Sequence, residues 1–203
     1  MAFSDNELFD IRDAEGRPTG EVKARALVHR DGDLHGASHI FIFRRGRDGM
    51  EVLLQRRSPG KDSFPNCLDT SSAGHLDAGD TFEEAAYREL EEELGVRRKD
   101  LPSDGLQFLF FYHHEYQAQF NGRLFHDNEI EAVYAVELDR PAEWFRVEEA
   151  EIQEVVWMPV REVAERLSIS NDELLQRIEA GTEEICIVPE EFQLCLQCFK
   201  PRI

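Results

Sequence analysis

The residues from about Asp80 to Gly95 carry the pattern that most restricts how this chain can fold. Apolar side chains recur there at the spacing of one helix face, at Phe82, Ala85, Ala86, Leu90 and Leu94. Thr81 and Glu84 have the spacing of a capping box at the start of a helix, and Gly95 stands where a left-handed C-terminal cap belongs. The segment therefore predicts an amphipathic helix.

The same predicted helix carries a group of charged residues, Arg88, Glu89, Glu92 and Glu93. Positions three and four residues apart share one face of a helix, so the three glutamates project together. Their mutual repulsion weakens the helix unless a cation offsets it, and hard oxygen ligands suit Mg²⁺ or Mn²⁺. From these residues alone, an acidic helix that simply faces solvent is the alternative interpretation.

Segments with the two-residue period or the apolar, β-branched content of strands lie on both sides of this helix. They predict an N-terminal hairpin and further strands, at 7–13, 21–29, 38–45, 50–57, 107–116, 129–138 and 154–160. Residues 58–74 are so rich in Pro, Gly, Ser and Asp that no regular structure is expected there. Helical patterns that would cover the sheet follow later in the chain, at 158–167, 171–178 and 189–199.

This order of elements favours an α+β sandwich in which helices flank a mixed sheet. With 203 residues, the chain is long enough for one well-packed domain with appendages, and we expect a single domain over 1–203. The core is expected at about 36–165, the N-terminal hairpin at 5–30 and a C-terminal helical extension at 166–203.

The charge balance limits the partners that the chain can bind. With 23 Lys and Arg residues against 42 Asp and Glu residues, its formal net charge is −19, which repels nucleic-acid backbones and suits metal cations. The same acidity is also explained by solubility or by a salty habitat. We expect no binding of nucleic acid.

We expect a cytoplasmic location, because the sequence shows no targeting signal and its cysteines do not suggest disulfides. The sequence has no basic start followed by an apolar run and no stretch near the roughly 20 apolar residues of a membrane helix, so no membrane contact is expected. Four cysteines are too few and too unevenly spaced for a disulfide framework. Cys195 and Cys198 are expected to pack on a helix, with a zinc or redox role as the weaker alternative.

The predicted helix and the loop before it resemble a known family motif. Gly74, five residues, an acid, seven residues, Arg-Glu-Leu, one residue, Glu-Glu, one residue and Gly-Val match the Nudix box at every fixed position except Asp80, where the family has Glu. The resemblance implies a Nudix α/β/α sandwich. It also implies a hydrolase that uses Mg²⁺ or Mn²⁺ to cleave the diphosphate linkage of a small-molecule substrate.

The resemblance also implies roles for individual residues. Glu89, Glu92 and Glu93 would bind metal, and Arg88 would orient a glutamate. In such a mechanism metal ions neutralise charge on the diphosphate and lower the pKa of the attacking water, while a carboxylate takes its proton. Glu92 and Glu129 are the candidates for that base, and Glu129 is also a candidate metal ligand because it matches an acidic residue that related proteins present opposite the helix.

Neighbouring acidic residues are weaker candidates. Asp127 is the lesser candidate of this segment. Glu131 alternates with apolar neighbours, which suits an exposed position on a strand.

The stretch LLQRRSPGKDSFPNCLDTSSAGH resembles isopentenyl-diphosphate isomerases and the hydrolases related to them. By that match, Arg57 and Lys61 would contact substrate phosphate, although two solvated side chains on a surface loop are the alternative. The isomerases have a catalytic cysteine where this chain has Ala73, and their Nudix box is degenerate. Both differences favour hydrolysis, with isomerisation as the rival activity. A non-catalytic ligand-sensing Nudix domain is a further rival, but such domains typically lose box glutamates and gain a basic DNA-binding module.

Three histidines are candidates for a second metal site. His75 follows Gly74 as it does in the isomerases, and His29 and His35 lie near the positions of two ligand histidines in those enzymes, with a spacing that differs by one residue. Ordinary hydrogen-bonded or surface histidines are the alternative. Nucleoside diphosphate derivatives and isoprenoid diphosphates both stay open as substrates. Dimers are frequent in the family, which leaves a homodimer open.

Overall fold

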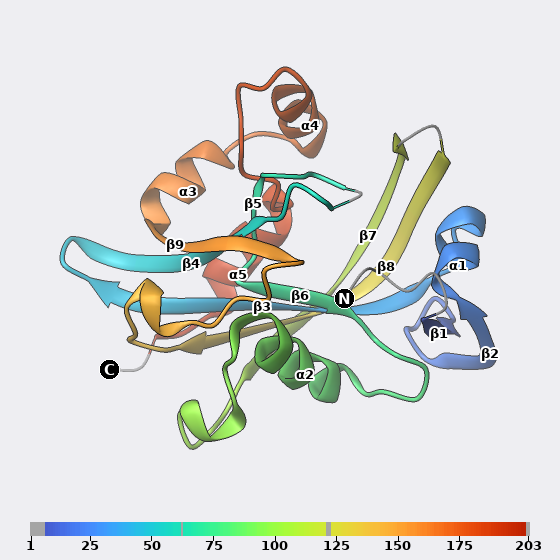
Figure 1. The fold of residues 1–203 in the computed structure, drawn as a ribbon, viewed down its shortest axis with the longest axis horizontal. Coiled ribbons are helices and arrows are strands. Elements are labelled where there is room, and N and C mark those ends of the chain that lie inside the picture. Colours follow the sequence, from blue (N-terminus) through green and yellow to red (C-terminus); the bar gives the residue numbers. More distant parts are fainter. Residues whose placement is uncertain (1–6, 62, 121–122, 202–203) are drawn as a thin grey trace.

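A mixed β-sheet forms the centre of the structure (Figure 1). In the computed structural model, which describes residues 7–61, 63–120 and 123–201, seven strands form this sheet and their central order is β5-β4-β3-β8-β7. Outside this path, strand β6 pairs with β3 and strand β9 pairs with β4. The strands are β3 (His35–Gly46), β4 (Gly49–Arg57), β5 (Leu68–Asp69), β6 (Ser72–His75), β7 (Gln107–Phe120), β8 (Arg123–Glu137) and β9 (Ile152–Pro159).

The pairing of the strands agrees with the expected mixed sheet. Strands β3 and β4 form the predicted antiparallel hairpin, and β7 and β8 form a second one. Strands β3 and β8 are parallel neighbours, with His35 opposite Glu129 and Ala37 opposite Glu131. Short 3-10 helices, η1 (Arg98–Asp100) and η2 (Ala142–Trp144), lie in the connections.

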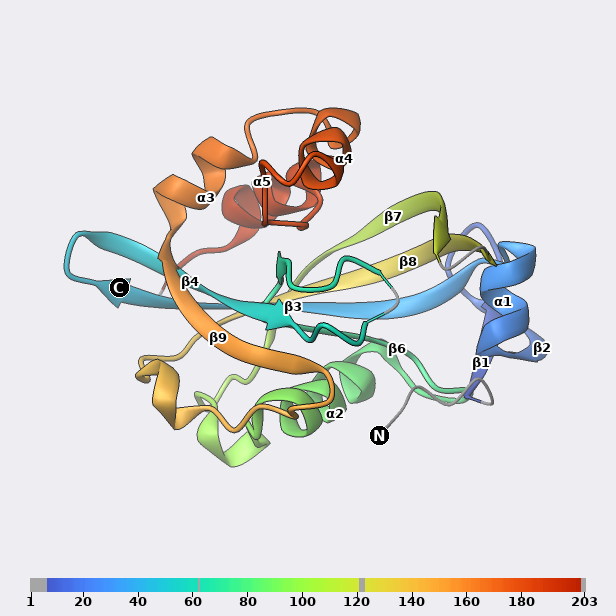
Figure 2. The ribbon, with the colours of Figure 1, turned by 45° about the horizontal axis from the view of Figure 1, so that its top comes forward.

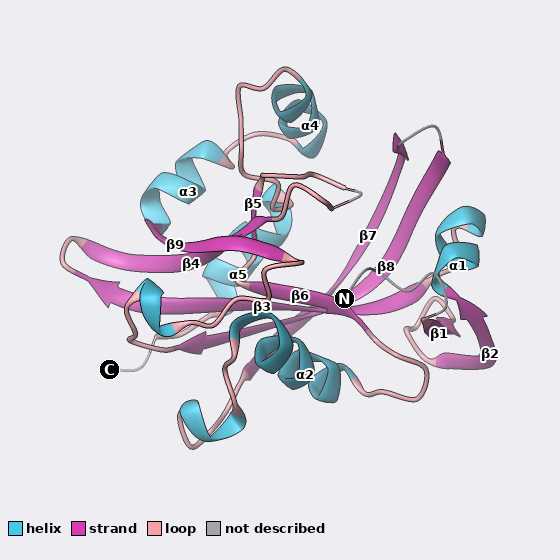
Figure 3. Ribbon diagram, viewed as in Figure 1, coloured by secondary structure: helices cyan, strands magenta, loops and turns pink. Residues whose placement is uncertain are grey.

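Helices cover both faces of the sheet, so the predicted sandwich is confirmed (Figures 2 and 3). Helix α2 (Phe82–Leu94) lies on one face, where Ile40 and Leu90 belong to one buried cluster. Helices α3 (Val160–Arg166), α4 (Asn171–Glu179) and α5 (Pro189–Cys198) lie on the opposite face, where Phe41 packs with Phe192 in a second cluster. Because successive strand residues point to opposite faces, even-numbered residues of β3 face α2 and odd-numbered ones face α5.

Helix α2 begins and ends where its sequence predicts. The Thr81 hydroxyl accepts a hydrogen bond from the Glu84 backbone amide, and the Glu84 carboxylate accepts one in return from the Thr81 amide. Gly95 ends the helix in the left-handed region at φ 68°, where a glycine avoids the strain that a side chain brings. The apolar stripe packs on the sheet and so sets the rotation of the helix about its own axis. That rotation in turn determines the direction in which the glutamates point.

The N-terminal hairpin differs from its prediction in its second half. Strands β1 (Leu8–Arg12) and β2 (Pro18–Ala24) form the hairpin, but the segment expected to continue β2 folds as helix α1 (Arg25–Asp31). The helix brings Val28 into a buried cluster with Phe9 and Ile11. This burial outweighs the weak local preference for extended structure.

The loop expected at 58–74 is shorter than its composition suggested. Strands β5 and β6 occupy its second half, and β6 pairs with β3 through Ala37 and His75. The prediction of an irregular segment was therefore wrong after residue 67. The cause is backbone pairing: an unpaired stretch next to the edge of β3 would leave buried amides and carbonyls without partners.

The cysteines lie in different environments. All four are free, and Cys195 is buried on α5, whereas Cys198, which was also expected to pack there, is exposed. Among the described residues, no helix is both long enough and apolar enough to cross a membrane.

Candidate active site

A cavity of about 890 Å³ opens beside β6 and is lined by residues from the hairpin, the sheet, α2 and α5. It brings together most of the side chains that the sequence singled out, namely His29, Arg57, Lys61, His75, Arg88, Glu89, Glu92, Glu93, Asp127 and Glu129. His35 lies behind the cavity wall and is fully buried.

Glu89 lies directly over Gly74 of β6. A methyl group on Gly74 would be 2.2 Å from the Glu89 carboxyl carbon, so the carboxylate occupies the space that only a glycine leaves. Arg88 donates a hydrogen bond to Glu89 (Nη1 to Oε1, 2.6 Å) and a second one to the His75 carbonyl oxygen (2.9 Å). Asp80, where the family motif has Glu, still reaches Arg88 at 3.4 Å.

Glu93 is buried one turn further along α2. Its carboxylate accepts hydrogen bonds from the Ser72 hydroxyl (2.7 Å) and the Ala73 amide (3.1 Å). Burial, reinforced by the charge of Glu93, raises the pKa of Glu89 to about 8, and burial raises the pKa of Glu93 to about 7. Two neighbouring buried carboxylates with raised pKa values form a site with an excess of negative charge, and a hard divalent cation fits that donor set.

Glu92 differs from the other two glutamates of the helix. Its side chain is 62% exposed and lies 3.6 Å from Arg88. The helix therefore presents two buried carboxylates and one that is open to solvent. The predicted trio shares one side of α2, but in this arrangement Arg88 holds Glu89, while Ser72 and Ala73 hold Glu93.

Arg57 and Lys61 lie on the cavity wall but already have acidic partners. Arg57 donates to Asp69 (Nη1 to Oδ2, 2.8 Å) and to the Ser63 carbonyl oxygen (3.0 Å). Lys61 donates to the Glu151 carboxylate. Both side chains are mostly buried, so neither is the solvated loop residue of the alternative interpretation. Phosphate binding by either side chain would compete with these ion pairs.

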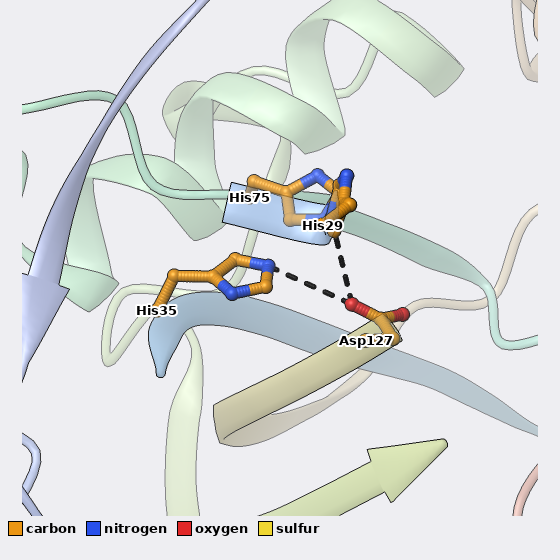
Figure 4. Close-up of side chains that lie close together, drawn as sticks. All are labelled: His29, His35, His75 and Asp127. Carbon is orange, nitrogen blue, oxygen red and sulfur yellow. Dashed lines mark ion pairs between the residues drawn. The ribbon is translucent and has the colours of Figure 1, made fainter. Parts of the chain in front are cut away.

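The three candidate histidines come together with Asp127 (Figure 4). One ligand atom from each of His29, His35, His75 and Asp127 lies within 4.8 Å of the others. The Nε2 atoms of His29 and His35 lie 3.5 and 3.6 Å from the same Asp127 oxygen. These three atoms are buried without a hydrogen-bond partner among the described residues. Nitrogen and oxygen donors left unpaired in this way fit a transition-metal ion.

Glu129 borders this histidine group. Its Oε1 atom lies 2.9 Å from His75 Nε2 and 3.3 Å from His35 Nε2. Burial alone would raise the pKa of Glu129, but the two histidines lower it well below its ordinary value. Burial lowers the pKa of His75 to about 3. Glu129 is therefore an ionised carboxylate at the rear of the cavity.

Glu131 is buried, so the expectation of an exposed strand position was wrong. Helix α5 covers its face of the sheet, and sequence alternation shows which residues share a face but not what covers that face. Around Glu131 the structure gathers His39, His114 and Glu191, which the sequence reasoning did not select. A signal was present, because His39 alternates in phase with buried Phe41 and Phe43.

Comparison with known proteins gives consistent results. A sequence model of the NUDIX domain matches residues 33–178. Nudix hydrolase 3 of Arabidopsis thaliana is 42% identical over 164 residues, which are 80% of this chain and 20% of that protein. An isopentenyl-diphosphate Delta-isomerase of Photobacterium profundum is 32% identical over 98 residues, which are 48% of this chain and 54% of that protein.

Structural comparison supports the same fold. The chain is similar to the crystal structure of DR0079 from Deinococcus radiodurans, with a TM-score of 0.66 and 20% sequence identity. The aligned region covers 96% of this chain and 100% of the DR0079 chain. The first curated relatives are longer than the matched region, since the alignments cover 20%, 45% and 61% of their lengths.

Proposed function

The chain belongs to the Nudix hydrolase family, and from this premise we propose that it hydrolyses the diphosphate linkage of a small organic substrate with the help of Mg²⁺ or Mn²⁺. The observation that carries the proposal is the position of Glu89 and Glu93. They lie on adjacent turns of α2, where Glu93 is buried and the Glu89 side chain is mostly buried, and both line the cavity that also contains Arg57 and Lys61. Anionic and cationic groups thus face one space large enough for a small ligand.

Glu89, Glu92 and Glu93 would hold the metal ion. When bound, such an ion neutralises charge on the diphosphate and makes an attacking water more acidic. Arg88 acts through Glu89: it bridges that carboxylate to the His75 carbonyl and so fixes the direction of the carboxylate. Glu93 is fixed by Ser72 and Ala73, which makes the pair a preorganised set.

The proton acceptor is Glu92 in this proposal, and Glu129 is a metal ligand. The histidines hold the pKa of Glu129 well below its ordinary value, which makes Glu129 a weak proton acceptor. A strongly ionised carboxylate is instead a good ligand. Glu92 is the exposed glutamate of the helix, so solvent water reaches it directly.

Arg57 and Lys61 would bind substrate phosphate by exchanging partners. Each cation is held by one carboxylate, Asp69 or Glu151, that keeps it directed at the cavity. An incoming phosphate offers more negative charge than either carboxylate, and the planar guanidinium of Arg57 matches its geometry.

We propose a second metal site at His29, His35 and His75 together with Asp127. The unpaired, buried Nε2 atoms of His29 and His35 support it. The site lies next to Glu129, so an ion there would stand close to the proposed Mg²⁺ ligands.

Hydrolysis is favoured over isomerisation because the cavity has no thiol at the required place. Ala73 lines the cavity where the isomerases have their cysteine, and an alanine cannot transfer a proton. Cys67 is buried in the loop before β5. The presence of Glu89, Glu92 and Glu93, the three helix glutamates of the box, also disfavours a non-catalytic sensing domain. Nucleoside diphosphate derivatives and isoprenoid diphosphates both fit the charged part of the site.

We also propose that the chain is a single domain. The cavity supports this because Phe9 of the hairpin, Glu93 of the core and Glu191 of the C-terminal extension all line it. A site built from all three parts requires them to stay in place relative to one another.

A screen with Mg²⁺ tests the proposed activity, with inorganic phosphate measured directly and again after an added phosphatase has released it from monophosphate products. Nucleoside diphosphates, nucleotide sugars and isoprenoid diphosphates are offered to the wild type and to Glu93→Gln, and the variant is expected to lose at least ~100-fold in turnover. Glu91→Gln is the matched control, because Glu91 is an exposed glutamate of the same helix that pairs with Arg97. Equal turnover in the wild type and Glu93→Gln would remove the mechanism.

A further inference from the structure

Three potential metal ligands meet on the face of the sheet that α5 covers. His39 comes from β3, Glu131 from β8 and Glu191 from α5, and one ligand atom of each lies within 4.8 Å of the others. Glu131 and Glu191 are each only 1% exposed, and all three side chains line the cavity. None of them belongs to the Nudix motif or to the group around His29.

The spacing of these atoms agrees with tetrahedral coordination. Metal–ligand bonds of about 2.0–2.2 Å place neighbouring ligands of a tetrahedral zinc site about 3.3–3.6 Å apart. His39 Nδ1 lies 2.9 Å from Glu191 Oε1 and 3.7 Å from Glu131 Oε2. His39 and Glu191 are at hydrogen-bond distance, so an ion between them would replace that bond and separate the two atoms by about 0.4 Å, from 2.9 to 3.3 Å.

The state of Glu131 gives an independent reason to expect a ligand. Both of its carboxylate oxygens are buried and accept no hydrogen bond from any described residue, although His39 and His114 lie within 4 Å. A buried carboxylate without hydrogen bonds is unfavourable, so such groups are commonly paired with a cation or coordinate a metal ion. The oxygens point toward His39 and His114, where that ion would lie.

Charge balance is compatible with the same occupant. Two buried carboxylates need about two positive charges nearby, which either protonated His39 and His114 or one divalent ion with neutral imidazoles supplies. Imidazole nitrogen together with carboxylate oxygen suits the borderline ions of the zinc class better than Mg²⁺, which prefers oxygen ligands alone.

We infer that His39, Glu131 and Glu191 bind a divalent transition-metal ion of the Zn²⁺ class at a site of its own on the cavity wall. His114, whose Nδ1 lies 3.5 Å from Glu131 Oε1, orients that carboxylate. With protein ligands from three elements, the ion keeps a coordination position for the cavity and ties α5 to the sheet.

The site is separate from the histidine group next to it. His35 and Glu129 form one register pair of the β3–β8 ladder, and Glu131 lies two residues further along β8, which is about 6.6 Å at the usual rise of a strand. Variants at the two places therefore remove different ions.

Metal counting on the intact chain tests the inference. The chain is stripped with a chelator and titrated with Zn²⁺ and with Co²⁺, whose visible absorption reports tetrahedral coordination. Glu191→Gln and Glu131→Gln are each expected to bind one ion fewer than the wild type, with at least ~100-fold weaker affinity at that site, since loss of even a second-shell group costs 10–100-fold. Glu190→Gln is the control, because Glu190 is the exposed neighbour on α5 and contacts Tyr112 instead.

The outcomes separate this site from the proposed active site. Glu191→Gln leaves the α2 glutamates and the group around His29 unchanged, so its other ions should stay bound. The inference fails if Glu191→Gln and Glu131→Gln bind the same number of ions as the wild type with the same affinity. Anomalous scattering at the zinc edge from wild-type crystals soaked in Zn²⁺ needs no variant, and absence of a peak between the three side chains refutes the site equally.

Discussion

The contact between Gly74 and Glu89 makes Gly74→Ala a sensitive test of the proposed active site. A Cβ atom at this position would lie 2.2 Å from the Glu89 carboxyl carbon and 2.4 and 2.5 Å from its oxygens, whereas real Cβ contacts are essentially never under 3.0 Å. The carboxyl carbon must therefore retreat by at least about 0.8 Å, from 2.2 to 3.0 Å. Since Arg88 holds Glu89 from the other side, the carboxylate cannot move without losing that bond.

The expected cost falls on activity more than on stability. A misplacement of about 1 Å in catalytic geometry can lower a rate about 100-fold, so kcat with saturating Mg²⁺ and substrate should fall by about that factor. Overpacking typically costs about 1–3 kcal/mol of unfolding free energy, which urea unfolding measures on the same protein. The Gly74 backbone lies outside the left-handed region, so alanine adds no conformational strain.

A double-mutant cycle isolates the cause. If Gly74→Ala acts by displacing the Glu89 carboxylate, its effect on kcat should largely disappear in a Glu89→Gln background, where that carboxylate is already absent. An equal loss of kcat in both backgrounds would refute this reasoning, and so would wild-type kcat in Gly74→Ala.

Further predictions concern helix α2 and Arg57, the proposed phosphate-binding residue. Leu90→Ala empties a fully buried position of α2 and should lower the unfolding free energy by about 2–5 kcal/mol in urea titrations, whereas a loss under 1 kcal/mol would contradict the packing. Thr81→Ala removes the N-cap hydrogen bond of α2 and should lower the unfolding free energy by about 1 kcal/mol, measured by thermal unfolding. An unchanged unfolding free energy would show that the cap does not stabilise the helix. Arg57→Lys replaces a planar guanidinium by a compact ammonium group and removes one charged hydrogen bond to substrate phosphate. KM should therefore rise about tenfold or more. An unchanged KM would show that Arg57 binds Asp69 and not the substrate.

Local features of this fold could be predicted from the sequence because their causes lie within a few residues. Helix α2 follows from an apolar stripe and two caps, and all three are properties of neighbouring positions. The segment Arg25–Asp31 has a left-handed glycine cap at Gly32, but it is only seven residues long and has no side-chain cap at its start. Its helix forms because Val28 packs with Phe9, a contact that the local pattern does not show.

The candidate site also has some features that the sequence predicts and others that depend on contacts between distant segments. One helix carries the three glutamates, so their spacing can be read from the sequence. The pairing of β6 with β3 then places Ser72 and Ala73, which donate hydrogen bonds to Glu93. Which of these glutamates is buried was decided by that pairing and not by the spacing.

The sequence by itself determined helix α2, its cluster of glutamates and the β3–β4 hairpin, because each depends on a short-range period. Only the tertiary structure decided that Glu131 is buried and that Glu191, sixty residues later, meets it beside His39. The physical reason is that periodicity records which side chains share a face, whereas the environment of a charge is set by whatever packs onto that face from elsewhere in the chain.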